Sequence, residues 1–264
     1  MENLLEIKNL KVIFVQGNRV ITAVDGVDLS IAKDEVVVLA GESGSGKTVT
    51  ALSITKVLPA SAKMICASIN FNAIDLMQLD EGSLVKIRGK EIAYIFQEPV
   101  SFLNPVYTIG SQIIETIMLH QNKSKKQARD EALDLLNLVK MAQPERVLLN
   151  YPHQLSGGMN QRAFIAMALA CKPRLLIADE PTTSLDVSIE AQILKLLMDL
   201  KKKLGFSLLF ITHNLSIAKR IADRVYVMYK GKIVEEAGIG QIFNSPQHFH
   251  TKELISAYEK IGRI

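Results

Sequence analysis

The feature that most constrains the fold of this chain is a glycine-rich octapeptide, residues 41–48, which reads Gly-Glu-Ser-Gly-Ser-Gly-Lys-Thr. It has the spacing G-x-x-x-x-G-K-[ST] of loops that hold phosphate groups. An apolar run over 35–40 precedes it, and Val49, Leu52 and Leu58 behind it mark one face of a helix. A buried strand, a tight turn and a helix in this order indicate an α/β fold with a parallel sheet.

The octapeptide predicts a site for the phosphates of a nucleotide. Its glycines let backbone N–H groups turn inward around phosphate oxygens, and the helix N-terminus adds a favourable dipole. Lys47 is expected to reach the β- and γ-phosphates, and the Thr48 hydroxyl to bind Mg²⁺. The alternative, a turn that contains lysine by chance, is disfavoured by the flanking strand and helix. The residues expected to contact the nucleotide here are Gly41, Ser43, Gly44, Ser45, Gly46, Lys47 and Thr48.

The rest of the chain alternates between strand and helix patterns around one polar, helical block. Residues 4–40 show the period-two alternation of half-buried strands, and 108–149 is helical and more polar. Buried strands separated by a helix return from residue 175 onward. We expect a single domain over 1–264, whose core of about 1–106 and 171–264 carries a helical lobe of about 107–170.

Two adjacent acids end one of the buried strands, at Leu175-Leu176-Ile177-Ala178-Asp179-Glu180. Asp179 is suited to hold Mg²⁺ through its water shell, and Glu180 to polarise an attacking water. The alternative is a strand that ends in two solvated acids. The phosphate loop elsewhere in the chain favours the catalytic interpretation.

Composition excludes several other classes of protein. The 264 residues are 48% hydrophobic and contain two cysteines, too few for a disulfide framework or a cluster of four thiolates. The N-terminus lacks a signal-peptide pattern, and no window supplies the roughly 18 apolar residues of a membrane-spanning helix. We therefore expect a soluble cytoplasmic chain. Its net charge of +4 owes much to basic runs over 123–129 and 201–203, which fit a solvated helix face, with contact to an anionic membrane surface or to nucleic acid as the alternatives.

A third motif leads to a known family. Leu155-Ser156-Gly157-Gly158-Met159, followed by Gln161-Arg162, sits at a loop-to-helix junction where Ser156 can cap the helix. These residues resemble the Leu-Ser-Gly-Gly-Gln signature of ABC ATPases, with Met159 in place of Gln. The motifs occur in the family's order, and the resemblance covers nearly the whole chain. It implies an α/β fold: a P-loop NTPase core with a parallel sheet, an N-terminal antiparallel β subdomain and an inserted α-helical subdomain.

Four further positions match the family. Gln97, after the strand-like run 92–96, looks like the Q-loop glutamine, which contacts Mg²⁺ and water. Asp186 belongs to Ser184-Leu185-Asp186, which is similar to the D-loop at the dimer interface. His213 matches the switch histidine at the γ-phosphate. Phe14 stands where the family stacks an aromatic ring on adenine, and its alternative is a core phenylalanine on a strand.

The resemblance implies a motor that works in pairs. Two such domains bind two ATP molecules head to tail, and Ser156, Gly157 and Gly158 contact the nucleotide seated on the opposite subunit. The implied cofactors are ATP and Mg²⁺. The implied partners are a second ABC ATPase, two transmembrane permease subunits and, indirectly, a substrate-binding protein, at the cytoplasmic face of the membrane.

Three segments resemble the peptide and nickel importer branch: 98–105, 156–162 and 246–251. His250 departs from the Tyr common in that branch, and the chain ends without the cysteines that many peptide importers carry. Peptide and metal-chelate import both remain open. A rival class comprises ABC-type ATPases that act on nucleic acid or the ribosome. The short spacing between phosphate loop and signature, without sustained heptads, disfavours a coiled-coil member of that class, and we expect no nucleic-acid partner.

Overall fold

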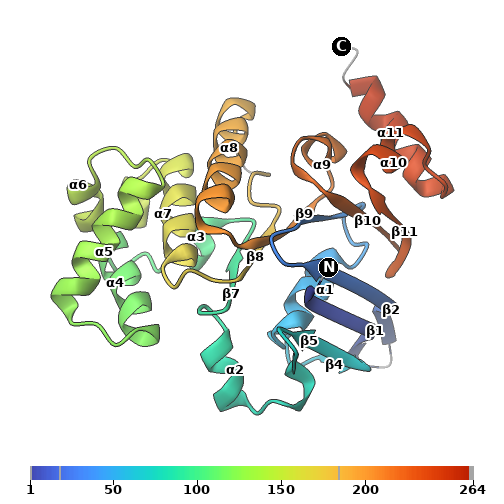
Figure 1. The fold of residues 1–264 in the computed structure, drawn as a ribbon, viewed down its shortest axis with the longest axis horizontal. Coiled ribbons are helices and arrows are strands. Elements are labelled where there is room, and N and C mark those ends of the chain that lie inside the picture. Colours follow the sequence, from blue (N-terminus) through green and yellow to red (C-terminus); the bar gives the residue numbers. More distant parts are fainter. Residues whose placement is uncertain (1, 18, 184, 262–264) are drawn as a thin grey trace. The chain divides into compact units, whose positions relative to one another are not determined.

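A computed structural model describes residues 2–17, 19–183 and 185–261 of the chain (Figure 1). Residue contacts divide it into two compact units, Met1–Leu84 with Ser207–Ile264 and Val85–Phe206. The predicted helical lobe of 107–170 falls inside the second unit, and its own limits stay a prediction. No helix among the described residues is long and apolar enough to cross a membrane.

The first unit contains an antiparallel sheet built on one long hairpin. Strands β1 and β2 pair along most of their length and join at Gly17, which has a positive φ of 57°. The alternation seen in the sequence buries Leu5, Ile7, Leu10 and Val12 completely, as expected for a sheet with one face on the core. The strand order is β2-β1-β5-β6, and β4 also pairs with β1. The strands are β1 (Asn3–Gln16), β2 (Arg19–Ala32), β4 (Ala62–Ile65), β5 (Ser68–Phe71) and β6 (Ile74–Asp75).

Four other strands of this unit carry the parallel sheet. In the order β11-β10-β3-β9, strand β3 runs parallel to both of its neighbours and β11 closes the edge antiparallel to β10. Strands β3 and β9 are buried at every residue, which agrees with the apolar sequence of β3 and the apolar centre of β9, Leu208 to Ile211. The bounds are β3 (Val36–Ala40), β9 (Ser207–Thr212), β10 (Arg224–Tyr229) and β11 (Lys232–Gly238).

Helices of the first unit follow these strands. Helix α1 begins at the end of the phosphate loop, and α9 follows β9, as the strand-helix alternation predicts. Helix α2 crosses the boundary between the two units. The bounds are α1 (Lys47–Ile54), η1 (Leu76–Gln78), α2 (Glu81–Ile87), α9 (Leu215–Ile221), α10 (Ile239–Asn244) and α11 (Phe249–Ile261).

The second unit combines one parallel strand pair with a cluster of helices (Figure 1). Three of its helices start at polar caps: the hydroxyls of Thr108, Ser124 and Ser156 each accept a backbone N–H of the first turn. The bounds are β7 (Ile92–Ile95), α3 (Pro99–Phe102), α4 (Ile109–His120), α5 (Lys125–Leu138), α6 (Pro144–Leu149), η2 (Pro152–Gln154), α7 (Gly157–Leu169), β8 (Leu175–Asp179) and α8 (Val187–Leu204).

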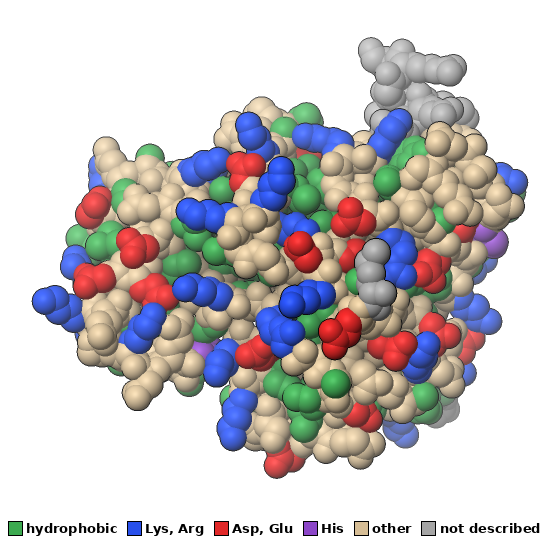
Figure 2. All heavy atoms as spheres, viewed as in Figure 1, with side chains coloured by type: hydrophobic (Ala, Val, Ile, Leu, Met, Phe, Trp, Pro, Cys, Tyr) green, Lys and Arg blue, Asp and Glu red, His purple; other side chains and the backbone are tan. Residues whose placement is uncertain are grey.

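The basic run of 123–129 lies at the start of α5, among acidic residues. Lys123 pairs with Glu131 at 2.5 Å, and Asp130 and Asp134 follow on the same helix. In Figure 2, basic and acidic side chains are interspersed over the part of the surface that these helices form. This mixture of signs is typical of a solvated helix face.

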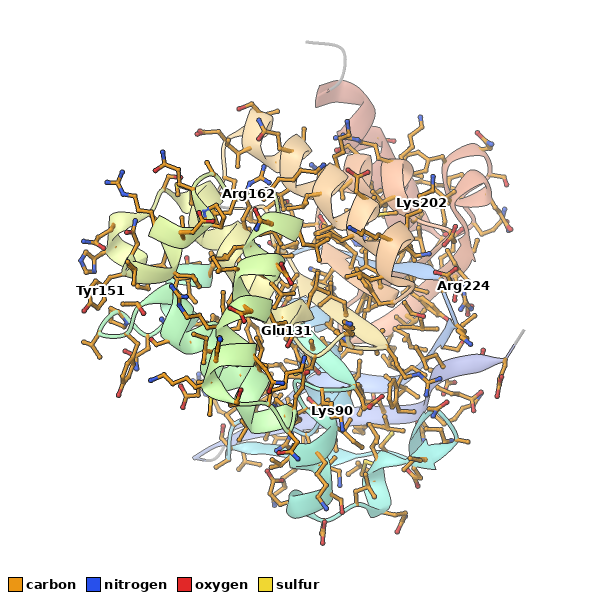
Figure 3. The ribbon with its side chains drawn as sticks, turned by 60° about the vertical axis from the view of Figure 1, so that its left-hand side comes forward. Lys90, Glu131, Tyr151, Arg162, Lys202 and Arg224 are labelled. Atoms are coloured by element: carbon orange, nitrogen blue, oxygen red, sulfur yellow. The ribbon has the colours of Figure 1, made fainter. Side chains whose placement is uncertain are left out.

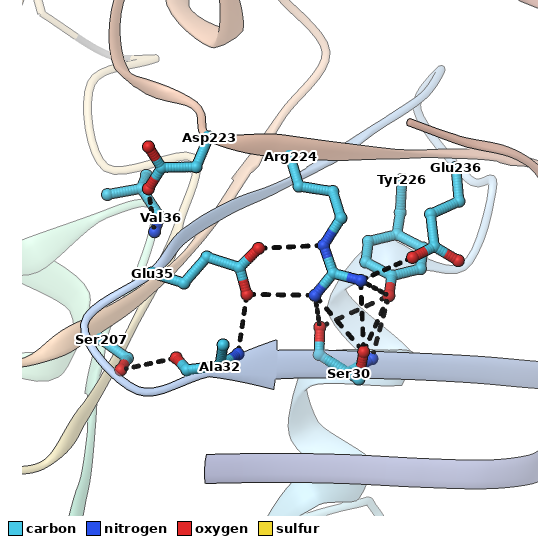
Figure 4. Close-up of polar contacts among 9 residues, drawn as sticks. All are labelled: Ser30, Ala32, Glu35, Val36, Ser207, Asp223, Arg224, Tyr226 and Glu236. Carbon is cyan, nitrogen blue, oxygen red and sulfur yellow. Dashed lines mark hydrogen bonds and ion pairs between the residues drawn. The ribbon is translucent and has the colours of Figure 1, made fainter. Parts of the chain in front are cut away.

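One guanidinium joins three strands of the first unit (Figure 4). Arg224 of β10 donates two hydrogen bonds to the carboxylate of Glu35, at 2.9 and 3.0 Å, just before β3. It also donates to the Ser30 carbonyl of β2 at 2.9 Å and to Glu236 of β11 at 2.6 Å. The Arg224 side chain is 24% exposed and that of Glu35 is 15% exposed, so solvent weakens this pair less than a surface pair.

A second carboxylate fixes the start of the last helix. Glu235 of β11 accepts hydrogen bonds from the amides of Gln247 and His248, at 2.8 and 2.9 Å, directly before α11. Burial alone raises the pKa of Glu235, but the hydrogen bonds that the carboxylate accepts outweigh burial, so its pKa lies below the ordinary value. Because the folded-state pKa is depressed, this stabilisation is present at neutral pH and is lost as the pH falls through the folded-state pKa.

We predict that Arg224→Met lowers the free energy of unfolding by about 2–3 kcal/mol, because the carboxylate of Glu35 is left partly buried without its partner. Thermal or urea unfolding of the purified chain measures the loss. Lys232→Met is the matched control, since its pair with Asp25 at 3.3 Å involves a side chain that is 62% exposed. The control should cost less than about 1 kcal/mol. Equal costs for the two variants would contradict a structural role for the network.

Candidate functional site

The phosphate loop lies between β3 and α1, pressed against the backbone of two other strands. A Cβ atom at Gly41 would lie 2.2 Å from the Met228 carbonyl oxygen of β10. One at Gly46, where φ is 108°, would lie 2.4 Å from the Ala23 carbonyl oxygen of β2. Neither position accepts a side chain, so the two outer glycines of the motif are required by close packing as well as by backbone conformation.

Inside the loop, Lys47 is only 5% exposed. Its ammonium donates to the carbonyls of Gly41 and Glu42, each at 2.8 Å, and so curls back over the loop. The Ser45 hydroxyl is buried and has no hydrogen-bond partner within the part of the chain that the structure describes. A buried cation and an unsatisfied hydroxyl beside the start of a helix fit the phosphate groups of a nucleotide.

Ser43, Gly44 and Thr48 of the same loop are exposed, so its outer side is open to solvent. His213 is exposed as well and follows β9, whose Thr212 pairs in register with Ala40 of β3. The first unit therefore brings His213 to the same sheet edge as the phosphate loop.

Phe14 lies on β1, half-buried, and pairs with Ile21 of β2. Two residues further along β2, Ala23 touches the loop at Gly46. Half-burial agrees with both interpretations of Phe14, a core residue and a ring for adenine, and the adenine contact stays a prediction.

The second unit brings together two predicted catalytic residues, Gln97 and Glu180, and one predicted Mg²⁺ ligand, Asp179, at the ends of β7 and β8. Ile95 pairs with Ala178, and Gln97 and Glu180 each come two residues after this pair. The Gln97 amide lies 3.5 Å from a carboxylate oxygen of Glu180. Asp179, at 7% exposed, ends β8.

Glu180 itself has a positive φ of 46°, a costly backbone conformation for a residue with a side chain. The Thr183 hydroxyl donates to its carboxylate at 2.9 Å. Sequence reasoning missed Thr183. The sequence feature that could have indicated it is its position three residues after Glu180, because a turn of that length places the hydroxyl beside the carboxylate.

The signature residues start α7. The Ser156 hydroxyl accepts the Met159 N–H at 3.4 Å, which confirms its capping role. A Cβ atom at Gly158 would lie 3.0 Å from Ile189 of α8, and one at Gly157 would lie 3.6 Å from Leu185. The signature therefore packs beside the predicted D-loop segment. Asp186 is exposed at the start of α8, and Ser184 lies outside the described residues.

Arg162 holds the signature helix in place (Figure 3). It donates to the Val139 carbonyl after α5 at 2.8 Å and to the Gln192 side chain of α8 at 3.3 Å. Arg162 thus contributes to packing within the second unit, whereas Ser156 and Gly157 of the signature are exposed.

A glycine-rich phosphate loop between a buried strand and a helix, with an acid pair after a second strand, defines a P-loop nucleotide-binding protein. The model of the ABC transporter family matches residues 24–183. The chain belongs to the ABC transporter family.

Relatives extend the match over nearly the whole chain. The oligopeptide transport ATP-binding protein AppD of Bacillus subtilis (strain 168) is 49% identical over 97% of this chain and 79% of its own length. The glutathione import ATP-binding protein GsiA of Escherichia coli (strain K12) is 44% identical over 99% of this chain, which corresponds to 43% of that protein. A dimeric ATP-binding cassette in a post-hydrolysis state, with ADP and Pi bound, matches with a TM-score of 0.78 at 28% identity over 89% of this chain and 98% of its own.

These matches confirm the predicted family, the α/β P-loop fold with its antiparallel and parallel sheets, and the ATPase activity. The chain is an ATP-binding and ATP-hydrolysing subunit of an ABC transporter. They lend no support to the rival interpretation, an ATPase acting on nucleic acid or the ribosome. The roles of individual site residues stay predictions.

We predict that Lys47→Ala weakens ATP binding at least about tenfold, because it removes the buried cation that faces the loop. A titration with a fluorescent ATP analogue measures the loss. Lys56→Ala is a matched control, since the Lys56 ammonium also donates to two carbonyls, those of Met77 and Leu79, at 3.1 and 3.2 Å. The control should bind ATP like the original chain. Unchanged affinity in Lys47→Ala would refute the assignment of the loop.

Proposed function

We propose that this chain is the ATPase subunit of an importer for small peptides. The observation that carries the proposal is the identity of 44–49% with peptide and glutathione transport subunits, over nearly all of this chain. The phosphate loop, acid pair and signature that such a motor requires all lie within the matched region. Import of nickel or a metal chelate is the second candidate, which the resemblance of 98–105 and 246–251 leaves open.

Each site residue has a chemical role in this proposal. The loop amides and Lys47 neutralise the phosphates, and the buried Ser45 hydroxyl, unsatisfied within the described residues, donates to one of their oxygens. The family resemblance assigns Thr48 of the first unit, and Asp179 and Gln97 of the second, to Mg²⁺, which would neutralise charge on the β- and γ-phosphates. These ligand types suit a hard cation that keeps several waters.

Hydrolysis in this proposal depends on Glu180. Its carboxylate orients the attacking water and accepts its proton, while the hydroxyl of Thr183 and the amide of Gln97 fix its direction. His213 contacts the γ-phosphate from the edge of β9, and Phe14 stacks on adenine. The left-handed backbone at Glu180 supports a functional role, because strain of this kind persists where the surroundings impose it.

A second ATPase subunit completes each nucleotide site in the proposal. Ser156, Gly157 and Gly158 leave the amides at the start of the 13-residue helix α7 open to solvent, where they can meet a phosphate bound to the opposite subunit. Asp186 of each subunit lies at the interface. The dimeric cassettes among the similar structures support this pairing.

We predict that Glu180→Gln lowers steady-state ATP hydrolysis by about 10²–10⁴-fold, because an amide cannot take the proton of the attacking water. ATP binding should persist, and ATP-bound dimers should accumulate on size-exclusion chromatography. Glu190→Gln is the matched control, since Glu190 also accepts a threonine hydroxyl, that of Thr182, at 3.3 Å. A turnover of Glu180→Gln within threefold of the control would remove Glu180 from this role.

The permease subunits, in this proposal, dock from the membrane onto the segment that follows Gln97. Four large apolar side chains of this segment are 52–72% exposed: Val100, Phe102, Val106 and Tyr107. Phe102 also stacks on Phe96 with ring centroids 4.0 Å apart, so it packs within its own unit and still presents half of its surface to solvent. A peripheral subunit at the cytoplasmic face, linked to a binding protein only through the permeases, follows from this docking.

We predict that Phe102→Asp abolishes co-purification with the permease pair and leaves ATP binding by the free subunit intact, because the charge destroys an apolar contact. The matched control is Phe249→Asp, which changes an equally aromatic side chain that is 70% exposed on α11. Normal assembly of Phe102→Asp with the permeases would contradict the docking role. Loss of ATP binding together with a lowered melting temperature would assign Phe102 to packing alone.

A further inference from the structure

The second unit has a groove of about 730 Å³ between α4, α5 and α6. Its apolar lining includes Met118, Leu119 and Leu149, which are 45%, 72% and 70% exposed. Large apolar side chains gathered around a hollow are a feature of surfaces that bind a partner.

Charge is distributed unevenly along this groove. Lys125 and Arg129 are four residues apart on α5, so they share one helix face, and both line the groove. Glu115 of α4 is the only carboxylate among the described lining residues. Across the described ranges, neither Lys125 nor Arg129 makes an ion pair, whereas Lys123 beside them is paired with Glu131. Two exposed cations without carboxylate partners thus stand at an apolar groove.

Helix α4, which forms one wall of the groove, is bonded to the end of the segment that we assign to permease docking. The Gln112 side chain of α4 accepts the Asn104 N–H at 2.8 Å and donates to the carbonyls of Asn104 and Tyr107, each at 3.1 Å. Gln112 is 8% exposed, so these bonds are shielded from water. They tie the end of the docking segment to the helix that forms one wall of the groove.

We propose that Lys125 and Arg129 select the docked permease helix by its charge: the groove takes a short amphipathic helix with an apolar face and carboxylates that reach these two cations. The inference rests on the proposed function for the identity of the partner. Complementarity supports it, because an apolar face fits Met118, Leu119 and Leu149, and carboxylates neutralise Lys125 and Arg129. Lys125 and Arg129 therefore determine which permease binds, and they take no part in ATP hydrolysis.

The test uses the full chain and two synthetic 14-residue helical peptides that share one leucine-rich face. One carries glutamates at both ends, and the other carries lysines at the same positions. Isothermal titration should show the glutamate peptide binding about tenfold more tightly than the lysine peptide at low salt, with the preference reduced in 0.5 M NaCl. The double variant Lys125→Glu/Arg129→Glu should invert the preference, and Glu115→Gln should strengthen binding of the glutamate peptide.

Lys126→Glu is the matched control, because Lys126 is an exposed neighbour on α5 that does not line the groove. It should keep the preference for glutamate. Equal binding of both peptides, or no binding of either, would overturn the inference. So would binding of the chain to phosphatidylglycerol vesicles that requires Lys125 and Arg129, since that result would assign the two cations to lipid.

ATP hydrolysis by the same preparations separates this inference from the proposed function. The double variant should hydrolyse ATP at the rate of the original chain, because neither cation belongs to the nucleotide site. A chain that selects the glutamate peptide but hydrolyses no ATP would refute the proposed motor and leave the charge selection standing. A chain that hydrolyses ATP and binds both peptides equally would refute the charge selection and leave the proposed motor standing.

Discussion

The close approach of the phosphate loop to the backbones of β2 and β10 is the constraint on which the first unit depends. At Gly41 and Gly46 there is room for a hydrogen atom and no more, so the loop, the antiparallel hairpin and the parallel sheet meet at a fixed separation. This packing sets Lys47 and Ser45 inside the loop while its outer side stays open. A loop backbone that is already fixed in this way suits the phosphate site that we propose, because less conformational freedom is lost on binding.

Polar bonds hold the strands that form this arrangement. Arg224 connects β2, β10 and β11 with Glu35, immediately ahead of β3, the strand that leads into the loop. Glu235 performs a comparable task at the start of α11. Both carboxylates are largely buried, and each is satisfied by several donors, which makes burial of their charge tolerable. The strands that stabilise the first unit are thus also the strands that position its phosphate loop.

The second unit keeps its chemistry and its surface functions apart. The acid pair and Gln97 lie at the ends of two parallel strands. The signature begins α7, and the groove with Lys125 and Arg129 lies among α4, α5 and α6. Arg162 and Gln112 anchor these elements internally through hydrogen bonds to backbone or side chains of the same unit. In our proposal, the surface that selects a permease is thus separate from the residues that handle ATP.

The sequence by itself determined the family, the strand-loop-helix around the phosphate loop and the places of the acid pair and the signature. These features are local, since each depends on a few neighbouring residues and on the apolar pattern around them. Only the tertiary structure decided that Thr183 contacts Glu180, that Arg224 joins strands far apart in the chain, and that Lys125 and Arg129 line an apolar groove without an ion pair to any described residue. Such contacts depend on how distant segments pack, and a pattern of neighbouring residues carries no record of that packing.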